Sequence, residues 1–134
     1  MQFSPINFLA VAIGTLAGLL FGLLWYAPQV FGRAWQKHTG LTDEQIRTGS
    51  ILLKFGPAII FMFVMGVALA AFMPTGLHWD HGAFGGMVMG GGVGATAIGL
   101  HYLFAKRSIN LFLIDAGYIV ITMTMFGAII AAMS

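Results

Sequence analysis

Four apolar stretches, separated by short polar segments, make up most of the chain, and each has the length of a membrane-spanning helix. They cover about residues 6–27, 51–72, 82–105 and 109–133. A helix rises 1.5 Å per residue, so about 20 apolar residues cross a bilayer core of roughly 30 Å. The pattern predicts an all-α integral membrane protein, a four-transmembrane-helix bundle that forms a single domain over residues 1–134.

The polar sequence between the first and second stretches predicts helix boundaries. Thr42 is followed three residues later by Gln45, the pattern of an N-cap with its capping-box partner. A helix that begins near Asp43 in this way can run directly into the second stretch. Pro28 is expected to end the first helix and Pro57 to kink the second, because proline lacks a backbone donor and crowds the preceding turn.

Small residues recur at every fourth position in two of the stretches. The third stretch has Gly82, Gly86, Gly90 and Gly94, and the first has Ala10, Gly14, Gly18 and Gly22. Residues four apart lie on one helix face, and a face of small residues lets another backbone approach closely. This glycine-zipper pattern predicts tight helix packing. Gly90→Leu is therefore expected to be more disruptive than Gly127→Leu, which lies outside the glycine line.

The same small residues raise the question of an internal repeat. A single shift places Ala10, Gly14 and Gly18 over Gly86, Gly90 and Gly94, and the ends of the second and fourth stretches align with a different shift. One interpretation is a pair of parallel helical hairpins related by an axis along the membrane normal, as in some transporters. The alternative is chance, because apolar stretches rich in glycine and alanine align easily.

Composition excludes several classes of protein. The chain is 59% hydrophobic and 7% charged, whereas about a quarter of the residues in soluble domains are charged. Its six basic and four acidic residues are too few for the dense basic patch of a nucleic-acid surface, so no nucleic-acid partner is expected. The absence of cysteine excludes disulfides, thiolate metal sites and cysteine nucleophiles.

The basic residues predict the orientation in the membrane. All six fall in or beside the first and third connections: Arg33, Lys37, Arg47, Lys54, Lys106 and Arg107. Cytoplasmic loops carry the excess of Lys and Arg, so both connections are expected in the cytoplasm. The N-terminus, the C-terminus and the turn at residues 78–81 are then expected outside.

Three segments carry a family resemblance: NFLA at residues 7–10, LWYxPxxFGxxW at 24–35, and GLT with acidic residues following at 40–42. On these segments the chain resembles the domain of unknown function 1761 family, small four-span membrane proteins of bacteria, over nearly its whole length. Ala27 stands where that family often has serine. The resemblance implies the four-span architecture and the bacterial cytoplasmic (inner) membrane. It carries over no catalytic or binding residue.

Asp115 is the strongest functional candidate. It lies about two turns into the fourth stretch, where a carboxylate is costly unless it is paired, neutralised or turned toward the bundle interior. His101 and Asp115 each lie seven residues from Ser108 in the turn between the last two stretches. In an antiparallel helix pair they therefore reach similar depth and could meet.

Further polar residues accompany this carboxylate. Tyr118 and Thr122 extend its face of the fourth helix, Tyr102 and Asn110 lie near the cytoplasmic ends of the last two helices, and Lys54 is a rival partner that the repeat places opposite it. Such a group could line a proton or cation pathway. It could equally be a buried polar clasp that fixes helix register.

His78, Asp80 and His81 have ligand chemistry at close spacing in the outer turn. A metal site normally needs more ligands and a second shell, so these residues are only weak metal candidates. A solvated or pH-responsive turn is the favoured interpretation. No metal or other cofactor is expected.

Two functions from different classes remain open. One is conduction or transport of a proton, cation or small solute through an oligomeric bundle. The other is a non-catalytic accessory or assembly role, in which the glycine grooves bind partner helices or lipid. The expected partners are the lipid bilayer and a second copy of the chain or other membrane helices. We do not expect an enzyme, because the sequence shows no paired carboxylates and no nucleophile with a base.

Overall fold

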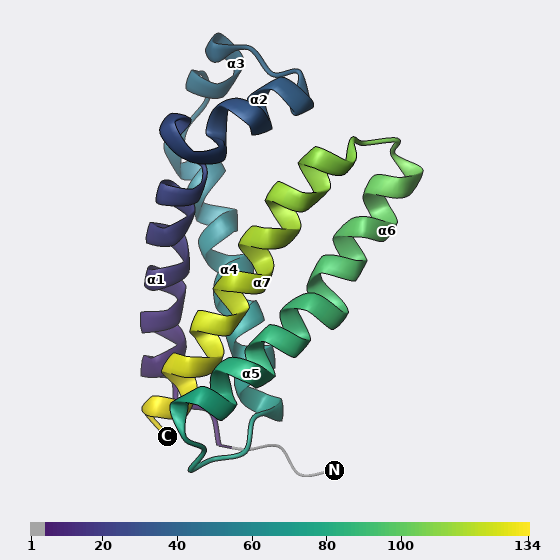
Figure 1. The fold of residues 1–134 in the computed structure, drawn as a ribbon. Helices are drawn as coiled ribbons and strands as arrows, with labels where there is room; N and C mark the ends of the chain where they lie inside the picture. The colour runs from purple at the N-terminus through teal and green to yellow at the C-terminus, as the bar shows by residue number, and fades with distance from the viewer. Residues whose placement is uncertain (1–4) are drawn as a thin grey trace.

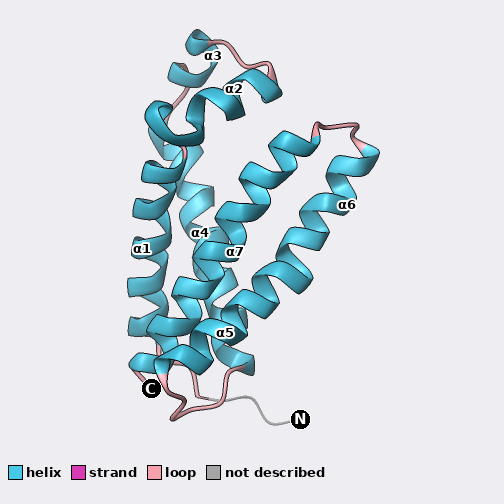
Figure 2. Ribbon diagram, in the orientation of Figure 1, coloured by secondary structure: helices cyan, strands magenta, loops and turns pink. Residues whose placement is uncertain are grey.

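The computed structural model describes residues 5–134 as helices joined by short loops (Figures 1 and 2). Four helical segments are long and apolar enough to cross a membrane. This confirms the predicted all-α, four-span architecture. The spans are α1 (Phe8–Trp25), α4 (Ile51–Phe72), the continuous series α5 (Trp79–Met89), η2 (Gly90–Ala95) and α6 (Thr96–Phe104), and α7 (Ile109–Ala132).

The connection after α1 folds into three short helical elements. A π-helical turn, η1 (Pro28–Gly32), starts at the proline, and α2 (Arg33–Thr39) and α3 (Asp43–Arg47) follow. The predicted capping box is present, since the Thr42 and Gln45 side chains bond each other's backbone N–H.

The expectation that this helix continues into the second span is wrong. α3 ends at Arg47, Thr48 is extended, and Gly49 has a φ of +105°, a conformation that glycine adopts readily. The chain therefore turns before α4 begins at Ile51. α4 then passes through Pro57 as a single helix.

α7 packs against the glycine face of the third span. A Cβ at Gly86 would overlap the carbonyl oxygen of Met123, and one at Gly94 would lie 2.7 Å from Cγ2 of Ile119. A Cβ at Gly82 or Gly90 would likewise press on α7. The small-residue face thus lets the backbone of α7 approach the backbone of the third span closely within one chain.

The same helix also covers the small-residue face of α1. A Cβ at Gly14 would lie 2.5 Å from the Phe126 ring, one at Gly18 would lie 2.9 Å from Cγ2 of Thr122, and one at Gly22 would lie 2.8 Å from the Tyr118 hydroxyl. Phe126 and Thr122 are completely buried. α7 is therefore the central helix, held between α1 and the third span.

The remaining helix surfaces are apolar and exposed, as expected for side chains that face lipid. Leu53 in α4 is 77% exposed and Phe104 in α6 is 79% exposed. The third span is the least buried of the four. The two halves also differ in their connections, since η1, α2 and α3 join α1 to α4 whereas a short turn joins α6 to α7. The internal repeat stays a prediction.

The two ends of the bundle differ in charge. α2, α3 and the α6–α7 turn lie at one end, and the start of α1, the α4–α5 turn and the C-terminus lie at the other (Figure 1). The six basic residues all belong to the first of these ends, which we call the basic end. At the opposite end, the Asn7 side chain donates to the carbonyl of Met133 at 3.1 Å, which ties α1 to α7.

Candidate functional site

Asp115 joins three spans near the basic end. The Tyr26 hydroxyl, directly after α1, donates to one carboxylate oxygen of Asp115 at 2.6 Å. The Tyr102 hydroxyl, on α6, donates to the other oxygen. Both acceptor oxygens of one α7 side chain are thus used to hold α1 and the third span, which is the geometry of a polar clasp.

The structure does not bring His101 to this carboxylate. His101 precedes Tyr102 and its side chain is exposed, because consecutive residues of a helix point about 100° apart. Lys54 does not reach Asp115 either. Its ammonium group donates to the backbone carbonyl of Ile46 and closes the α3–α4 connection.

Tyr118 strengthens the same region through contacts with α1 and Tyr26. Its hydroxyl donates to the backbone carbonyl of Gly18 in α1 at 2.7 Å, and its ring lies edge-on to Tyr26 at a centroid distance of 5.3 Å. Trp25 adds a bond from its indole N–H to the carbonyl of Ile114 at 3.0 Å. Aromatic side chains thus fix the end of α1 against α7.

Thr122 lies one turn deeper than Tyr118 on α7. It is fully buried, and within residues 5–134 its hydroxyl has no hydrogen-bond partner. Its methyl group lies beside Gly18, and the Met62 side chain of α4 lies beside the same glycine. Thr122 therefore belongs to the core between α1, α4 and α7.

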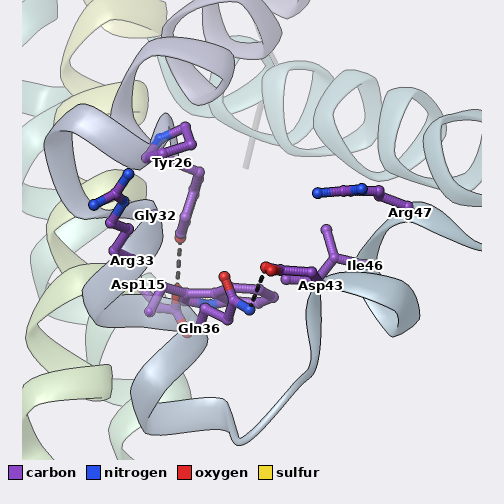
Figure 3. Close-up of a pocket in the computed structure, with 10 residues that line it drawn as sticks. Tyr26, Gly32, Arg33, Gln36, Asp43, Ile46, Arg47 and Asp115 are labelled. Atoms are coloured by element: carbon purple, nitrogen blue, oxygen red, sulfur yellow. Dashed lines mark hydrogen bonds between the residues drawn. The ribbon is translucent and has the colours of Figure 1, made fainter.

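A cavity of about 660 Å³, with charged side chains in its wall, opens beside this cluster (Figure 3). We call it the Asp115 cavity. Its wall comes from the end of α1, from η1, α2 and α3, and from α7. The lining residues are Tyr26, Pro28, Gly32, Arg33, Trp35, Gln36, Asp43, Ile46, Arg47 and Asp115.

The environment of Tyr26 keeps it a hydrogen-bond donor. Burial, and next to it the hydrogen bond to Asp115, raises the pKa of Tyr26 above its usual range. The phenol therefore stays protonated across physiological pH. A neutral donor of this kind holds the carboxylate without cancelling its charge.

A separate polar cluster lies at the start of α5. One oxygen of Asp80 lies 2.7 Å from Nδ1 of His78 and 3.2 Å from Nδ1 of His81. All three side chains are more than half exposed, and across residues 5–134 no three His, Asp or Glu side chains have the geometry of a metal site.

Sequence reasoning identified the carboxylate but missed most of its surroundings. In the sequence, Tyr26 stands out only as part of the family-resemblance segment at residues 24–35, and Arg33, Gln36 and Asp43 belong to the polar connection between the first two stretches. One signal was available, because Tyr26 lies at the end of the first apolar stretch and so at the same end of the bundle as Asp115.

Fold and site together define a four-span membrane protein with a charged cavity at its basic end. The chain belongs to the family described as "Protein of unknown function (DUF1761)", whose model matches residues 9–131. This confirms the resemblance seen in the sequence. No curated protein and no solved structure matches the chain.

Proposed function

We propose that this protein transports a small polar or charged solute, coupled to a proton or cation, and that the solute binds in the Asp115 cavity. One observation carries the proposal: a carboxylate within a membrane span is held by neutral phenols and lines a cavity of about 660 Å³. Ionisable groups within spans commonly mark substrate and ion pathways. The volume is also typical of small-molecule sites, about 300–1,000 Å³.

An accessory role is the second candidate, and the packing of α7 weakens it. That role depended on open glycine grooves for partner helices. The grooves of α1 and of the third span are instead covered by α7 of the same chain. Transport therefore accounts for more of the structure, and catalysis is not part of the proposal.

Transport also calls for a passage beyond the cavity. Phe126, Val11 and Thr122 are completely buried and fill the centre of the monomer. We therefore propose that the path runs between copies in a homo-oligomer. The third span offers the surface for a second copy, because it is the least buried span of the chain.

Asp115→Asn is expected to reduce proton or cation flux at least about ten-fold while leaving the bundle folded. Asparagine keeps the shape and an acceptor oxygen, so stability should fall by only about 1 kcal/mol. Flux of protons and of potassium would be measured in proteoliposomes after pH and salt jumps, and the mass of the complex in a mild detergent would check the oligomer.

Asp80→Asn is the matched control, because Asp80 is an exposed carboxylate at the opposite end of the bundle. Its flux should match that of the unaltered protein. Unchanged flux in Asp115→Asn, in a protein of the same mass and stability, would contradict transport and leave the accessory role ahead.

We further propose that the protein lies in the bacterial cytoplasmic (inner) membrane with its basic end inside. All six basic residues lie at that end, and such residues are retained in the cytoplasm. A reporter active only outside the cytoplasm should therefore be active when fused after Ser134 and inactive within residues 29–49. The reverse pattern of activity would overturn this orientation.

A further inference from the structure

The Asp115 cavity is lined by basic and by acidic side chains. Arg33 and Arg47 contribute guanidinium groups, and Asp43 and Asp115 contribute carboxylates. Within residues 5–134 none of these four groups forms an ion pair with another. Neutral groups bond the carboxylates instead, with the Gln36 amide donating to Asp43 at 2.8 Å and two phenols donating to Asp115.

This arrangement leaves the charges available to a ligand. Formally the two positive and two negative groups sum to zero. A purely cationic ligand would be attracted by the carboxylates but repelled by the guanidinium groups, and a purely anionic ligand would meet the converse. Like-charge juxtaposition of this kind suppresses the wrong ligand. A ligand that carries both charges can place each beside its complement.

The guanidinium groups indicate which anion fits. A guanidinium presents a planar set of donors that matches phosphate oxygens, and Arg33 and Arg47 offer such donors on two sides of the cavity (Figure 3). Trp35 and Tyr26 in the cavity wall lie edge to face with ring centroids 6.0 Å apart. Aromatic residues of this kind lie at the headgroup level of membranes, where phosphates are abundant, and their rings also attract ammonium groups.

We infer that the Asp115 cavity binds an ammonium–phosphate zwitterion of headgroup size. The inference rests on the proposed function, since it names the solute class for the same site. The phosphate lies beside Arg33 and the ammonium group beside Asp43, which Figure 3 shows on different sides of the cavity. This chemistry occurs in phosphodiesters free in water and in the headgroups of membrane phospholipids.

Three soluble probes test whether the ligand is a zwitterion. Glycerophosphoethanolamine carries both charges, and its two parts, glycerol 3-phosphate and ethanolamine, carry one sign each. Calorimetric titration of the full chain in detergent should give at least about ten-fold tighter binding for the zwitterion than for glycerol 3-phosphate, which is only anionic, or for ethanolamine, which is only cationic. Equal affinity for glycerol 3-phosphate or for ethanolamine would reject the zwitterion class. So would no binding of the zwitterion.

Two matched pairs of variants test the site. Arg33→Gln and Asp43→Asn should each weaken zwitterion binding about five-fold or more, because each removes a charge from the cavity wall. Lys37→Gln, also on α2, and Glu44→Gln, also in the first turn of α3, change charges outside the wall and should leave binding unaltered. Equal weakening in both members of a pair would overturn the site.

Nanodiscs separate the two sources of the zwitterion. If the occupant is a lipid headgroup, phosphatidylethanolamine nanodiscs should reduce binding of the soluble probe relative to phosphatidylglycerol nanodiscs. If it is a free solute, the two should give equal affinity. Loss of flux in Asp115→Asn combined with no preference for the zwitterion would keep the transport proposal and reject this inference alone.

Discussion

Gly86→Ala is expected to destabilise the bundle by about 3 kcal/mol or to prevent folding, because it forces two backbones apart. A Cβ at Gly86 would overlap the carbonyl oxygen of Met123 and would lie 2.8 Å from its carbonyl carbon. Both are backbone atoms of α7, so no side-chain rotation relieves the overlap. Separating α5 from α7 would also open the neighbouring contact between Gly82 and Gly127.

Gly85→Ala is the matched control in the same helix. A Cβ at Gly85 has nothing within 4 Å, so this variant should be as stable as the parent protein or slightly more so, since alanine favours helix over glycine. Unfolding in mixed micelles, followed by circular dichroism, compares the two. Equal losses in both variants would contradict the packing of α5 on α7.

The same contacts reverse the expectation that Gly90→Leu is more disruptive than Gly127→Leu. A Cβ at Gly127 would overlap the carbonyl oxygen of Gly82, which is backbone. A Cβ at Gly90 would lie 2.9 Å from Cβ of Met123 and 3.0 Å from Cα of Val120. The tighter contact is therefore the one at Gly127, which lies outside the four-glycine line of the third span.

This reversal shows what the sequence pattern could and could not predict. Length and apolar composition were enough for the four spans, because a bilayer fixes both. The four-residue period showed which face of the third span is small. Gly127 is not part of a four-residue glycine period on α7. The sequence therefore gave no signal that Gly127 packs against the glycine face of the third span.

The Asp115 site illustrates a second limit. Counting residues from the turn correctly gave the depth of the partner on α6, since helical rise is constant. Depth alone does not distinguish His101 from Tyr102, which differ by about 100° around the axis. Which of the two side chains faces α7 depends on how α6 and α7 cross. Tyr26 was harder still, because its contact spans 89 residues of sequence.

The Asp115 cavity requires that α3 end before α4 begins. Thr42 correctly predicted where α3 begins, because a capping box is a local pattern. The end of α3 depends on the positive φ of Gly49, a conformation that glycine permits but that the sequence alone does not impose. A helix continuing into α4 would have carried Asp43 and Arg47 elsewhere, and the charged wall would not have formed.

Removal of both phenol hydroxyls, in Tyr26→Phe/Tyr102→Phe, is expected to cost about 2 kcal/mol in the free energy of unfolding. Hydrogen bonds to a charged group contribute about 1.5–3 kcal/mol each in soluble proteins, and interhelical bonds in membranes average about 0.6 kcal/mol. The Asp115 cavity admits solvent to the carboxylate, which favours the lower part of that range. The loss should depend on Asp115, because both hydroxyls donate to it.

A thermodynamic cycle isolates that dependence. In an Asp115→Leu background, which has no acceptor, the two tyrosine substitutions should cost almost nothing, so the coupling free energy should be about 1–2 kcal/mol. His101→Ala serves as the control, because His101 adjoins Tyr102 but is exposed; its effect should be the same in both backgrounds. Unfolding would be measured in mixed micelles for every variant. Coupling of His101 to Asp115 as large as that of the tyrosines would contradict the clasp, because the carboxylate would then have a different partner in the membrane.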